Sequence, residues 1–160
     1  MRRLTVIHIN GPINSGKSTI GAALARALPD AEFIDGDDHG VSDQIPHATR
    51  WLMALERIEQ RIYTTEYQHL VIAYPIDESG FSRLDAACKK RSARFYVATL
   101  APPIETALSD RGERKLDSWE RSRIVDMYAS GYQSQAFSDI FIDTSQATVS
   151  ECVDRILQQL

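Results

Sequence analysis

The 160-residue sequence has no long apolar run, few cysteines and no strong excess of charge of one sign. No stretch of about 18 apolar residues occurs, so the sequence predicts no membrane span. A net charge of -4 without a basic stripe argues against a nucleic-acid partner. Cys88 and Cys152 lack metal-ligand spacing, which indicates buried free thiols in a reducing, cytoplasmic environment.

Internal repeats and low-complexity segments are missing too, and the length favours one domain over residues 1–160. Short apolar, β-branched runs alternate with segments of helical spacing. Strands are expected at 4–9, 31–35, 69–74, 94–100 and 140–143, and helices at 18–28, 50–66, 81–91, from 102, 117–130 and from 148. This alternation predicts an α/β fold, with a five-stranded parallel sheet between two helical layers and ligands at the carboxyl ends of the strands.

Residues 11–19 read Gly-Pro-Ile-Asn-Ser-Gly-Lys-Ser-Thr and lie between a strand and a helix. This is the pattern of a P-loop, in which main-chain N–H groups and the start of a helix surround phosphate. Lys17 then neutralises the β- and γ-phosphates of ATP, and the Ser18 hydroxyl is a ligand for Mg²⁺. The residues expected to bind nucleotide are Gly11, Asn14, Ser15, Gly16, Lys17, Ser18 and Thr19. The alternative, a glycine-rich turn with an unrelated lysine, agrees poorly with the strand–loop–helix context.

Two aspartates follow the second strand in Phe33-Ile-Asp-Gly-Asp-Asp-His-Gly40. Asp35 and Asp37 are two residues apart, so in extended backbone their side chains share one face. Beside a P-loop, one carboxylate can hold Mg²⁺ or its waters while the other orients and deprotonates an acceptor hydroxyl. The alternative is a polar turn, because Asp-Gly and Asp-Asp commonly form turns.

Together these motifs resemble the small P-loop kinases of the shikimate kinase and gluconate kinase group, with chloramphenicol phosphotransferase a more distant relative. The segment 35–40 and His47-Ala-Thr-Arg-Trp-Leu-Met-Ala-Leu55 are similar to gluconate kinase, and Phe141-Ile-Asp-Thr-Ser145 is similar to the group's usual ending. The resemblance covers most of the chain. It implies a P-loop NTPase-type fold and an enzyme, monomeric or homodimeric, that uses ATP and Mg²⁺ to phosphorylate a hydroxyl of a small molecule such as a sugar acid or cyclitol.

Carried over by position, the resemblance implies that Asp37 contacts the acceptor hydroxyl as the base and that Asp35 lies near Mg²⁺. Two departures concern the acceptor. Gly40 stands where gluconate kinase has proline, and Ala73-Tyr-Pro-Ile76 stands where shikimate kinases have a glycine run that touches substrate. These departures argue against shikimate and leave gluconate open. The third strand also lacks a terminal Walker-B aspartate, so metal binding depends on the P-loop serine, the aspartates and water, with Asp77 a weaker alternative.

An arginine-rich segment, Leu108-Ser-Asp-Arg-Gly-Glu-Arg-Lys115, follows the fourth strand and its helix. Arginines there can close over bound nucleotide and stabilise charge on the transferred group, and a guanidinium can stack on adenine. In the resembling kinases this segment is a mobile lid. We therefore predict a short lid at about 109–118, with Arg111 and Arg114 as catalytic residues and Arg111 also on the nucleotide. A solvated, charged helix end is the alternative.

The turn after the fifth strand, Asp143-Thr-Ser-Gln146, borders adenine in the similar kinases. Thr144, Ser145 and Gln146 are therefore candidate nucleotide contacts. A capping turn before the last helix explains the same residues equally well.

Residues 38–66 form an insertion where the resembling kinases bind their acceptor. An anionic or polyhydroxylated acceptor needs donors such as those of His39 and Arg50, which are the candidates here besides Asp37. Trp51 fits the apolar face of the helix and is expected in the core. Arg57 and Arg61 lie close in sequence to Glu56 and Glu59, so exposed pairing along the helix explains them at least as well as ligand contact.

Three functions compete on these observations. The first is a small-molecule kinase, of which an antibiotic-modifying phosphotransferase is a special case. The second is a regulatory ATPase without an acceptor, against which the aspartate pair and the missing Walker-B aspartate argue. The third is a kinase of nucleic-acid ends, against which the acidic net charge argues.

Overall fold

The computed structural model describes residues 2–37, 44–110 and 115–160. Its sheet has five strands in the order β2-β3-β1-β4-β5, and every neighbouring pair is parallel. The strands are β1 (Thr5–Asn10), β2 (Ala31–Asp35), β3 (His69–Ala73), β4 (Arg94–Leu100) and β5 (Ile140–Ile142). The predicted parallel α/β sheet is confirmed.

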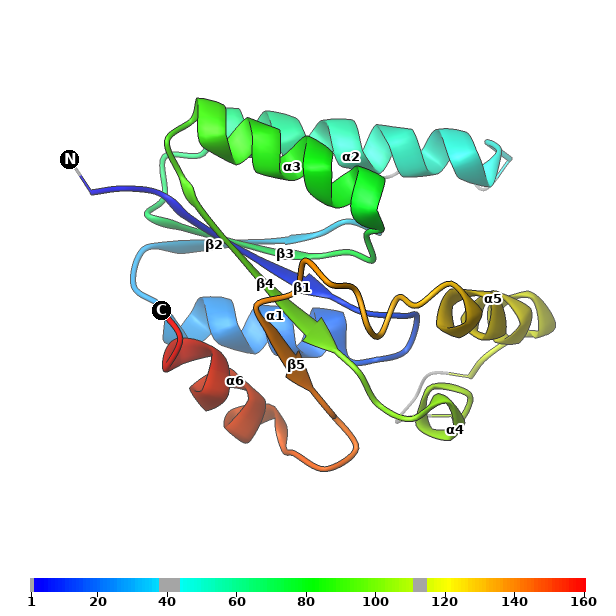
Figure 1. Cartoon of the computed structure of the whole chain (residues 1–160). Coiled ribbons are helices and arrows are strands. Elements are labelled where there is room, and N and C mark those ends of the chain that lie inside the picture. Colours follow the sequence, from blue (N-terminus) through cyan, green and yellow to red (C-terminus); the bar gives the residue numbers. More distant parts are fainter. Residues whose placement is uncertain (1, 38–43, 111–114) are drawn as a thin grey trace.

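Helices cover both faces of this sheet, so the three predicted layers are present (Figure 1). The helices are α1 (Lys17–Ala27), α2 (His47–Thr64), α3 (Glu78–Lys90), α4 (Ile104–Ala107), α5 (Ser118–Ala129) and α6 (Val149–Leu157). Helices α2 and α3 lie on one face, α1 and α6 lie on the other, and α4 and α5 lie beyond the carboxyl ends of the strands. None of the helices in the described part of the chain combines the length and apolarity needed to cross a membrane.

Two apolar clusters hold the layers together. On one face, Ile58 and Ile62 of α2 pack with Leu70 of β3, all nearly inaccessible to solvent. On the other face, Leu24 of α1 packs with Ile7 of β1. Because β1 contributes to both clusters through alternate residues, it is the buried centre of the sheet, as its continuous apolar run predicts.

Side-chain caps begin three of the helices, α3, α5 and α6. The side chain of Asp117 accepts a hydrogen bond from Glu120 N (2.7 Å) at the start of α5, and Thr148 forms a complete capping box with Glu151, so both helices begin where the sequence predicted. Asp77 caps α3 by accepting from Gly80 N (2.8 Å), so α3 begins at Glu78, three residues before the predicted start. Helix α2 likewise begins earlier than predicted, directly after Pro46.

The order of the strands fixes where a ligand can bind. Strand β1 lies between β3 and β4, so the chain leaves β1 toward one side of the sheet and later crosses to the other side. At such a switch point the loops beyond the carboxyl ends diverge and leave an opening for ligand. The segment 11–16 follows β1 at this point.

Candidate active site

The loop between β1 and α1 has the backbone of a phosphate cradle. Gly11 has φ +143° and Gly16 has φ +102°, values that favour glycine, and Asn14 is left-handed at φ +62°. A Cβ on Gly11 would lie 2.7 Å from the carbonyl oxygen of Leu100 and 2.8 Å from Ser15 Oγ. Only glycine therefore fits between β4 and the interior of this loop.

Two polar side chains of the loop are buried. Lys17 is 8% exposed, and its ammonium group reaches back over the loop to donate to the carbonyl of Pro12 (2.7 Å). The Ser15 hydroxyl is fully buried and has no hydrogen-bond partner among the described residues. Such a buried orphan hydroxyl points to a missing acceptor, and a phosphate oxygen supplies one.

The first turn of α1 is open to an anion. Helices α3, α5 and α6 begin with a side-chain cap, whereas α1 follows Gly16 and has no side-chain cap and no acidic residue in its first turn. Its first N–H groups and its positive dipole end are therefore available to phosphate. Ser18 and Thr19 are exposed in this turn. All the residues predicted to form the P-loop are thus assembled in one cradle.

Asp35, the last residue of β2, connects this cradle to the next loop. Its Oδ2 accepts a hydrogen bond from Ser18 Oγ (2.5 Å), and its Oδ1 accepts one from the main-chain N–H of Asp37 (3.1 Å). One carboxylate therefore holds the P-loop serine on one side and the Asp37 turn on the other.

The prediction that Asp35 and Asp37 share one face of a strand is wrong. Asp35 and Asp37 were expected to share a face because extended backbone alternates sides. Strand β2 ends at Asp35, however, and Gly36 and Asp37 form a turn. The two aspartates are brought together by the hydrogen bond within this turn, so the polar-turn alternative is confirmed. Their roles toward Mg²⁺ and an acceptor hydroxyl stay a prediction.

Ser18 and Asp35 offer Mg²⁺ the hard oxygen ligands that it prefers. Among the described residues, no group of three or more His, Cys, Asp or Glu side chains could hold a metal ion by itself. A magnesium ion at this position would therefore take most of its ligands from phosphate and water, which is its usual manner of binding in kinases.

The turn after β5 packs directly on the P-loop. The buried Thr144 hydroxyl donates to the carbonyl of Ser15 (2.9 Å), and Asp143 accepts from the main chain and hydroxyl of Ser145. Gln146 N donates to the carbonyl of Asp143 (3.1 Å). These residues thus form the capping turn considered above. Their contact with adenine stays a prediction.

The P-loop also contacts the base of the predicted lid. The side-chain amide of Asn14 donates to the carbonyls of Ala107 and Ser109, at 3.0 Å each. The lid was predicted to begin at about residue 109, so its first residue lies against the phosphate cradle.

The two ends of the predicted lid lie together. Leu116 N donates to Asp110 Oδ1 (3.2 Å), and Arg121 Nη1 donates to the carbonyl of Leu108 (2.7 Å). The catalytic candidates Arg111 and Arg114 lie outside the described residues, as does the acceptor candidate His39.

Five residues interact electrostatically with one another or with Asp37: His47 and Arg50 of α2, Tyr74 after β3, Arg123 of α5 and Tyr132 after α5. Together with Asp37 we call them the acceptor-side cluster. Burial lowers the pKa of His47, the nearby charges of Arg123 and Arg50 lower it further, and Asp37 opposes them. The Arg123 guanidinium lies 5.9 Å from the centre of the Tyr132 ring. Two arginines and the Asp37 carboxylate thus act on the same imidazole.

Rings connect the two helices that carry these arginines. His47, at the start of α2, meets Trp119, at the start of α5, with ring centres 5.8 Å apart. Trp51 is half-buried against the α2–α3 core, as predicted, and lies 5.2 Å from the Tyr74 ring. Helix α5 therefore borders the acceptor side of the site.

Arg50 was predicted from the sequence, whereas Arg123, Tyr74 and Tyr132 were missed. Arg123 lies more than 70 residues from Arg50 in the chain, and nothing near it in sequence suggests a ligand. One signal was present: Trp119 and Arg123 are four residues apart on α5 and so share one helix face.

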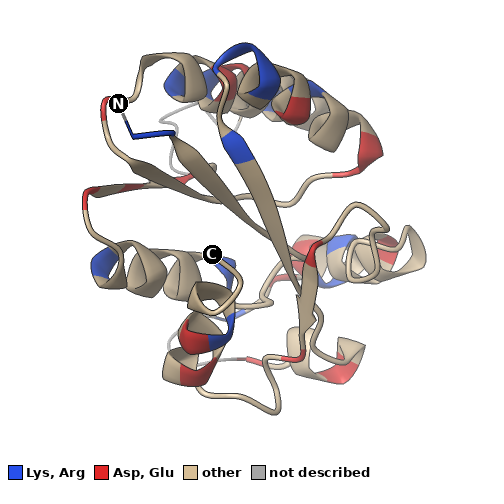
Figure 2. Ribbon diagram, turned by 60° about the vertical axis from the view of Figure 1, so that its left-hand side comes forward, with Lys and Arg blue, Asp and Glu red and all other residues tan. Residues whose placement is uncertain are grey.

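Arg61 does not pair along its own helix. Its Nε donates to Glu32 Oε1 of β2 (2.5 Å), so it joins α2 to the edge strand, and Glu59 pairs with Arg83 of α3 instead (2.7 Å). For Arg61 and Glu59, ion pairs between elements therefore take the place of the helix pairing that was weighed against ligand contact. Figure 2 shows basic and acidic positions interspersed over the helices.

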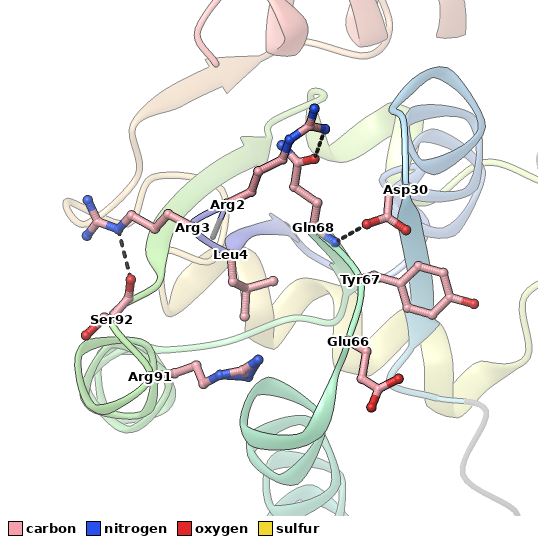
Figure 3. Close-up of a pocket in the computed structure, with 9 residues that line it drawn as sticks. All are labelled: Arg2, Arg3, Leu4, Asp30, Glu66, Tyr67, Gln68, Arg91 and Ser92. Atoms are coloured by element: carbon pink, nitrogen blue, oxygen red, sulfur yellow. Dashed lines mark hydrogen bonds between the residues drawn. The ribbon is translucent and has the colours of Figure 1, made fainter.

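A hollow of about 780 Å³ lies at the opposite, amino end of the sheet (Figure 3). Arg91 lines it, but its guanidinium donates to the carbonyls of Ile62, Tyr63 and Thr65 and so caps the end of α2. Arg2 donates to the side chain of Gln68 (2.9 Å). These contacts join elements of the fold, and the hollow lies far from the P-loop.

No protein-family model matches the chain. It is 27% identical to the shikimate kinase of Francisella philomiragia over 98% of this chain and 94% of that protein. Among solved structures, a gluconokinase from Sinorhizobium meliloti superposes with a TM-score of 0.74 at 17% identity, covering 99% of this chain and 92% of the other. Shikimate kinase from Acinetobacter baumannii in complex with shikimate gives a TM-score of 0.68 at 21% identity, covering 98% and 92%. The solved structures show the fold of the small P-loop kinases, and the similarity to the Francisella shikimate kinase indicates a small-molecule kinase.

Proposed function

We propose that this chain transfers the γ-phosphoryl group of ATP to a hydroxyl of a small, anionic, polyhydroxylated molecule. The observation that carries the proposal is the double hydrogen bond of Asp35, to Ser18 on one side and to the Asp37 turn on the other. It supports a geometry in which a triphosphate held by the P-loop lies beside the carboxylate of Asp37.

In this mechanism the chain mainly binds and positions the triphosphate. The N–H groups of the loop and of the first turn of α1 hold the phosphate oxygens, and Lys17 neutralises charge on the β- and γ-groups. Ser18 and Asp35 would hold Mg²⁺, which would supply further positive charge to the triphosphate. Arg111 and Arg114 are proposed to stabilise the transferred group from the lid, whose base Asn14 contacts.

Asp37 is proposed to accept the proton of the acceptor hydroxyl. The hydroxyl oxygen forms a bond to the γ-phosphorus, the bond from that phosphorus to the β,γ-bridging oxygen breaks, and ADP leaves. Positioning of the two oxygens in line, rather than covalent chemistry by the protein, provides most of the acceleration.

The cations of the acceptor-side cluster support an anionic acceptor. Arg50 and Arg123 come from different helices and both act on His47, while Asp37 is the acidic member of the cluster. A guanidinium binds a carboxylate with two parallel hydrogen bonds, so two arginines beside the base favour a sugar acid or related hydroxy acid. The relatives' names include shikimate kinase and gluconokinase, whose acceptors are of this kind.

The variant Asp37→Asn tests the reaction. We expect ATP affinity, measured by calorimetry, to stay within about twofold of the wild type and acceptor-dependent ADP formation to fall by about 10²–10⁴-fold, the usual contribution of a general base. ADP formation is measured with D-gluconate, shikimate, myo-inositol, adenosine and chloramphenicol as acceptors. Asp154→Asn, an exposed aspartate on α6, is the matched control and should behave as the wild type.

A regulatory ATPase would give a different pattern. ATP would bind tightly, no acceptor would stimulate ADP formation, and Asp37→Asn would hydrolyse ATP as the wild type does. That combination contradicts the proposal.

A further inference from the structure

Tyr74 occupies a central place at the carboxyl edge of the sheet. It directly follows β3, which lies between β2 and β1, and it is only 6% exposed. Its carbonyl accepts a hydrogen bond from the buried His8 Nε2 (2.7 Å), and its N–H donates to the carbonyl of Ile9 (3.3 Å). The main chain of Tyr74 is therefore held on β1, and its side chain has a defined direction.

The ring of Tyr74 lies against Gly36, the residue between Asp35 and Asp37. A Cβ on Gly36 would be 2.2 Å from Cδ1 and 2.5 Å from Cγ of this ring, distances that no real contact allows. Gly36 N also donates to the carbonyl of Ala73 (2.9 Å). The turn that carries Asp37 thus rests directly on the Tyr74 ring and its strand.

The phenol of Tyr74 lies within electrostatic reach of the charged members of the acceptor-side cluster. The charges of Asp37, Arg50 and Arg123 act on it, and they come from the turn after β2, from α2 and from α5. Trp51 supports the ring from α2, at 5.2 Å between ring centres and 31° between ring planes. Burial raises the pKa of Tyr74, so its hydroxyl is a neutral hydrogen-bond donor over the working pH range.

We propose that Tyr74 is a positioning and specificity-determining residue: its ring seats the turn that presents Asp37, and its hydroxyl binds a second hydroxyl of the acceptor. This inference rests on the proposed kinase function and deepens it. It assigns the acceptor to molecules with at least two neighbouring hydroxyl groups, of which one meets Asp37 and the other meets the phenol.

A double-mutant cycle in the ligand-free protein tests whether the Tyr74 ring supports the turn at Gly36. In the wild-type background, Gly36→Ala forces a methyl group into the Tyr74 ring and should lower the melting temperature by about 5 °C, as overpacking of a buried contact does. In the Tyr74→Ala background the ring is gone, so the same substitution should cost about 1 °C or less. An equal loss of melting temperature in both backgrounds would refute the contact between the Tyr74 ring and the turn.

The kinetic part uses the best acceptor among D-gluconate, shikimate, myo-inositol, adenosine and chloramphenicol. Tyr74→Phe keeps the ring and removes only the hydroxyl. It should raise the KM for the acceptor about tenfold, which corresponds to one lost hydrogen bond, while kcat and the KM for ATP change less than about twofold. Gly36→Ala should instead lower kcat by about 10²-fold, because the base is displaced.

Tyr67→Phe is the matched control, since Tyr67 is exposed at the far, amino end of the sheet (Figure 3). It should leave every kinetic constant unchanged. An unaltered acceptor KM in Tyr74→Phe would overturn the contact. If the wild type phosphorylates none of the acceptors, the proposed function fails, and the melting-temperature cycle still decides whether Tyr74 seats the turn.

Discussion

Acidification should destabilise this protein through a single buried imidazole. His8 lies in β1 and is inaccessible to solvent. Its Nε2 donates to the Tyr74 carbonyl (2.7 Å), and its Nδ1 has no hydrogen-bond partner among the described residues. Burial lowers the pKa of His8 from 6.5 to about 4, and the positive charge of Lys17 contributes in the same direction. The folded protein therefore holds His8 neutral at pH values where the unfolded chain protonates it.

The sign and size of the effect follow from linkage. A histidine with a lowered pKa contributes stability that is complete above pH 6.5 and is lost as the pH falls toward about 4. The difference between these two values, at about 1.4 kcal/mol for each pH unit, corresponds to about 3 kcal/mol of unfolding free energy. That loss is a large part of the 5–15 kcal/mol typical of single domains.

Urea unfolding of the wild type and of His8→Gln at several pH values between 7.5 and 4 measures this loss. The glutamine amide can still donate to the Tyr74 carbonyl but does not titrate. We expect the difference in unfolding free energy between the two proteins to change by about 3 kcal/mol in favour of the variant as the pH falls from 7 to 4. Parallel curves over this range would refute the reasoning, because they would mean that His8 costs nothing to protonate in the folded state.

Two further predictions concern the nucleotide and the acceptor. Gly11→Ala should weaken ATP binding by at least about tenfold in calorimetry, because the added Cβ would lie 2.7 Å from the Leu100 carbonyl oxygen. Gly131→Ala is the control and should keep the wild-type affinity, since the nearest atom to its added Cβ is 3.4 Å away. Equal ATP affinities for the two variants would contradict the phosphate cradle. Arg123→Gln should raise the KM for the acceptor about tenfold and leave the KM for ATP unchanged, because a charge-assisted hydrogen bond to the acceptor is lost. An unchanged acceptor KM would mean that Arg123 does not contact the acceptor.

Much of the fold could be predicted because its signals are local. The apolar runs of β2 and β4 predicted the observed bounds of these strands, and the helix predicted from residue 148 begins at its cap, Thr148. The starts of α2 and α3 were placed about three residues late, since Pro46 and Asp77 act as caps only in the conformation that the preceding loop adopts. A cap is a property of main-chain geometry, and spacing alone does not reveal it.

In the candidate site, too, features formed by neighbouring residues were predictable and contacts between elements were not. The P-loop was complete in the sequence, because its glycines, lysine and serine are neighbours in the chain. The pairing of Asp35 with Asp37 was expected for the wrong reason, since a turn and not a strand brings them together. Arg61 was paired with the wrong partners because Glu32 belongs to another element.

By itself, the sequence determined the alternation of strands and helices, the phosphate cradle after the first strand and the carboxylates after the second, since each depends on residues within one turn or one strand of each other. Only the tertiary structure decided that Arg123 of α5 and Arg50 of α2 act on the same histidine and that the Tyr74 ring lies against Gly36. These contacts join residues from different elements, and their distances depend on how helices pack on a twisted sheet, a quantity that no local pattern contains.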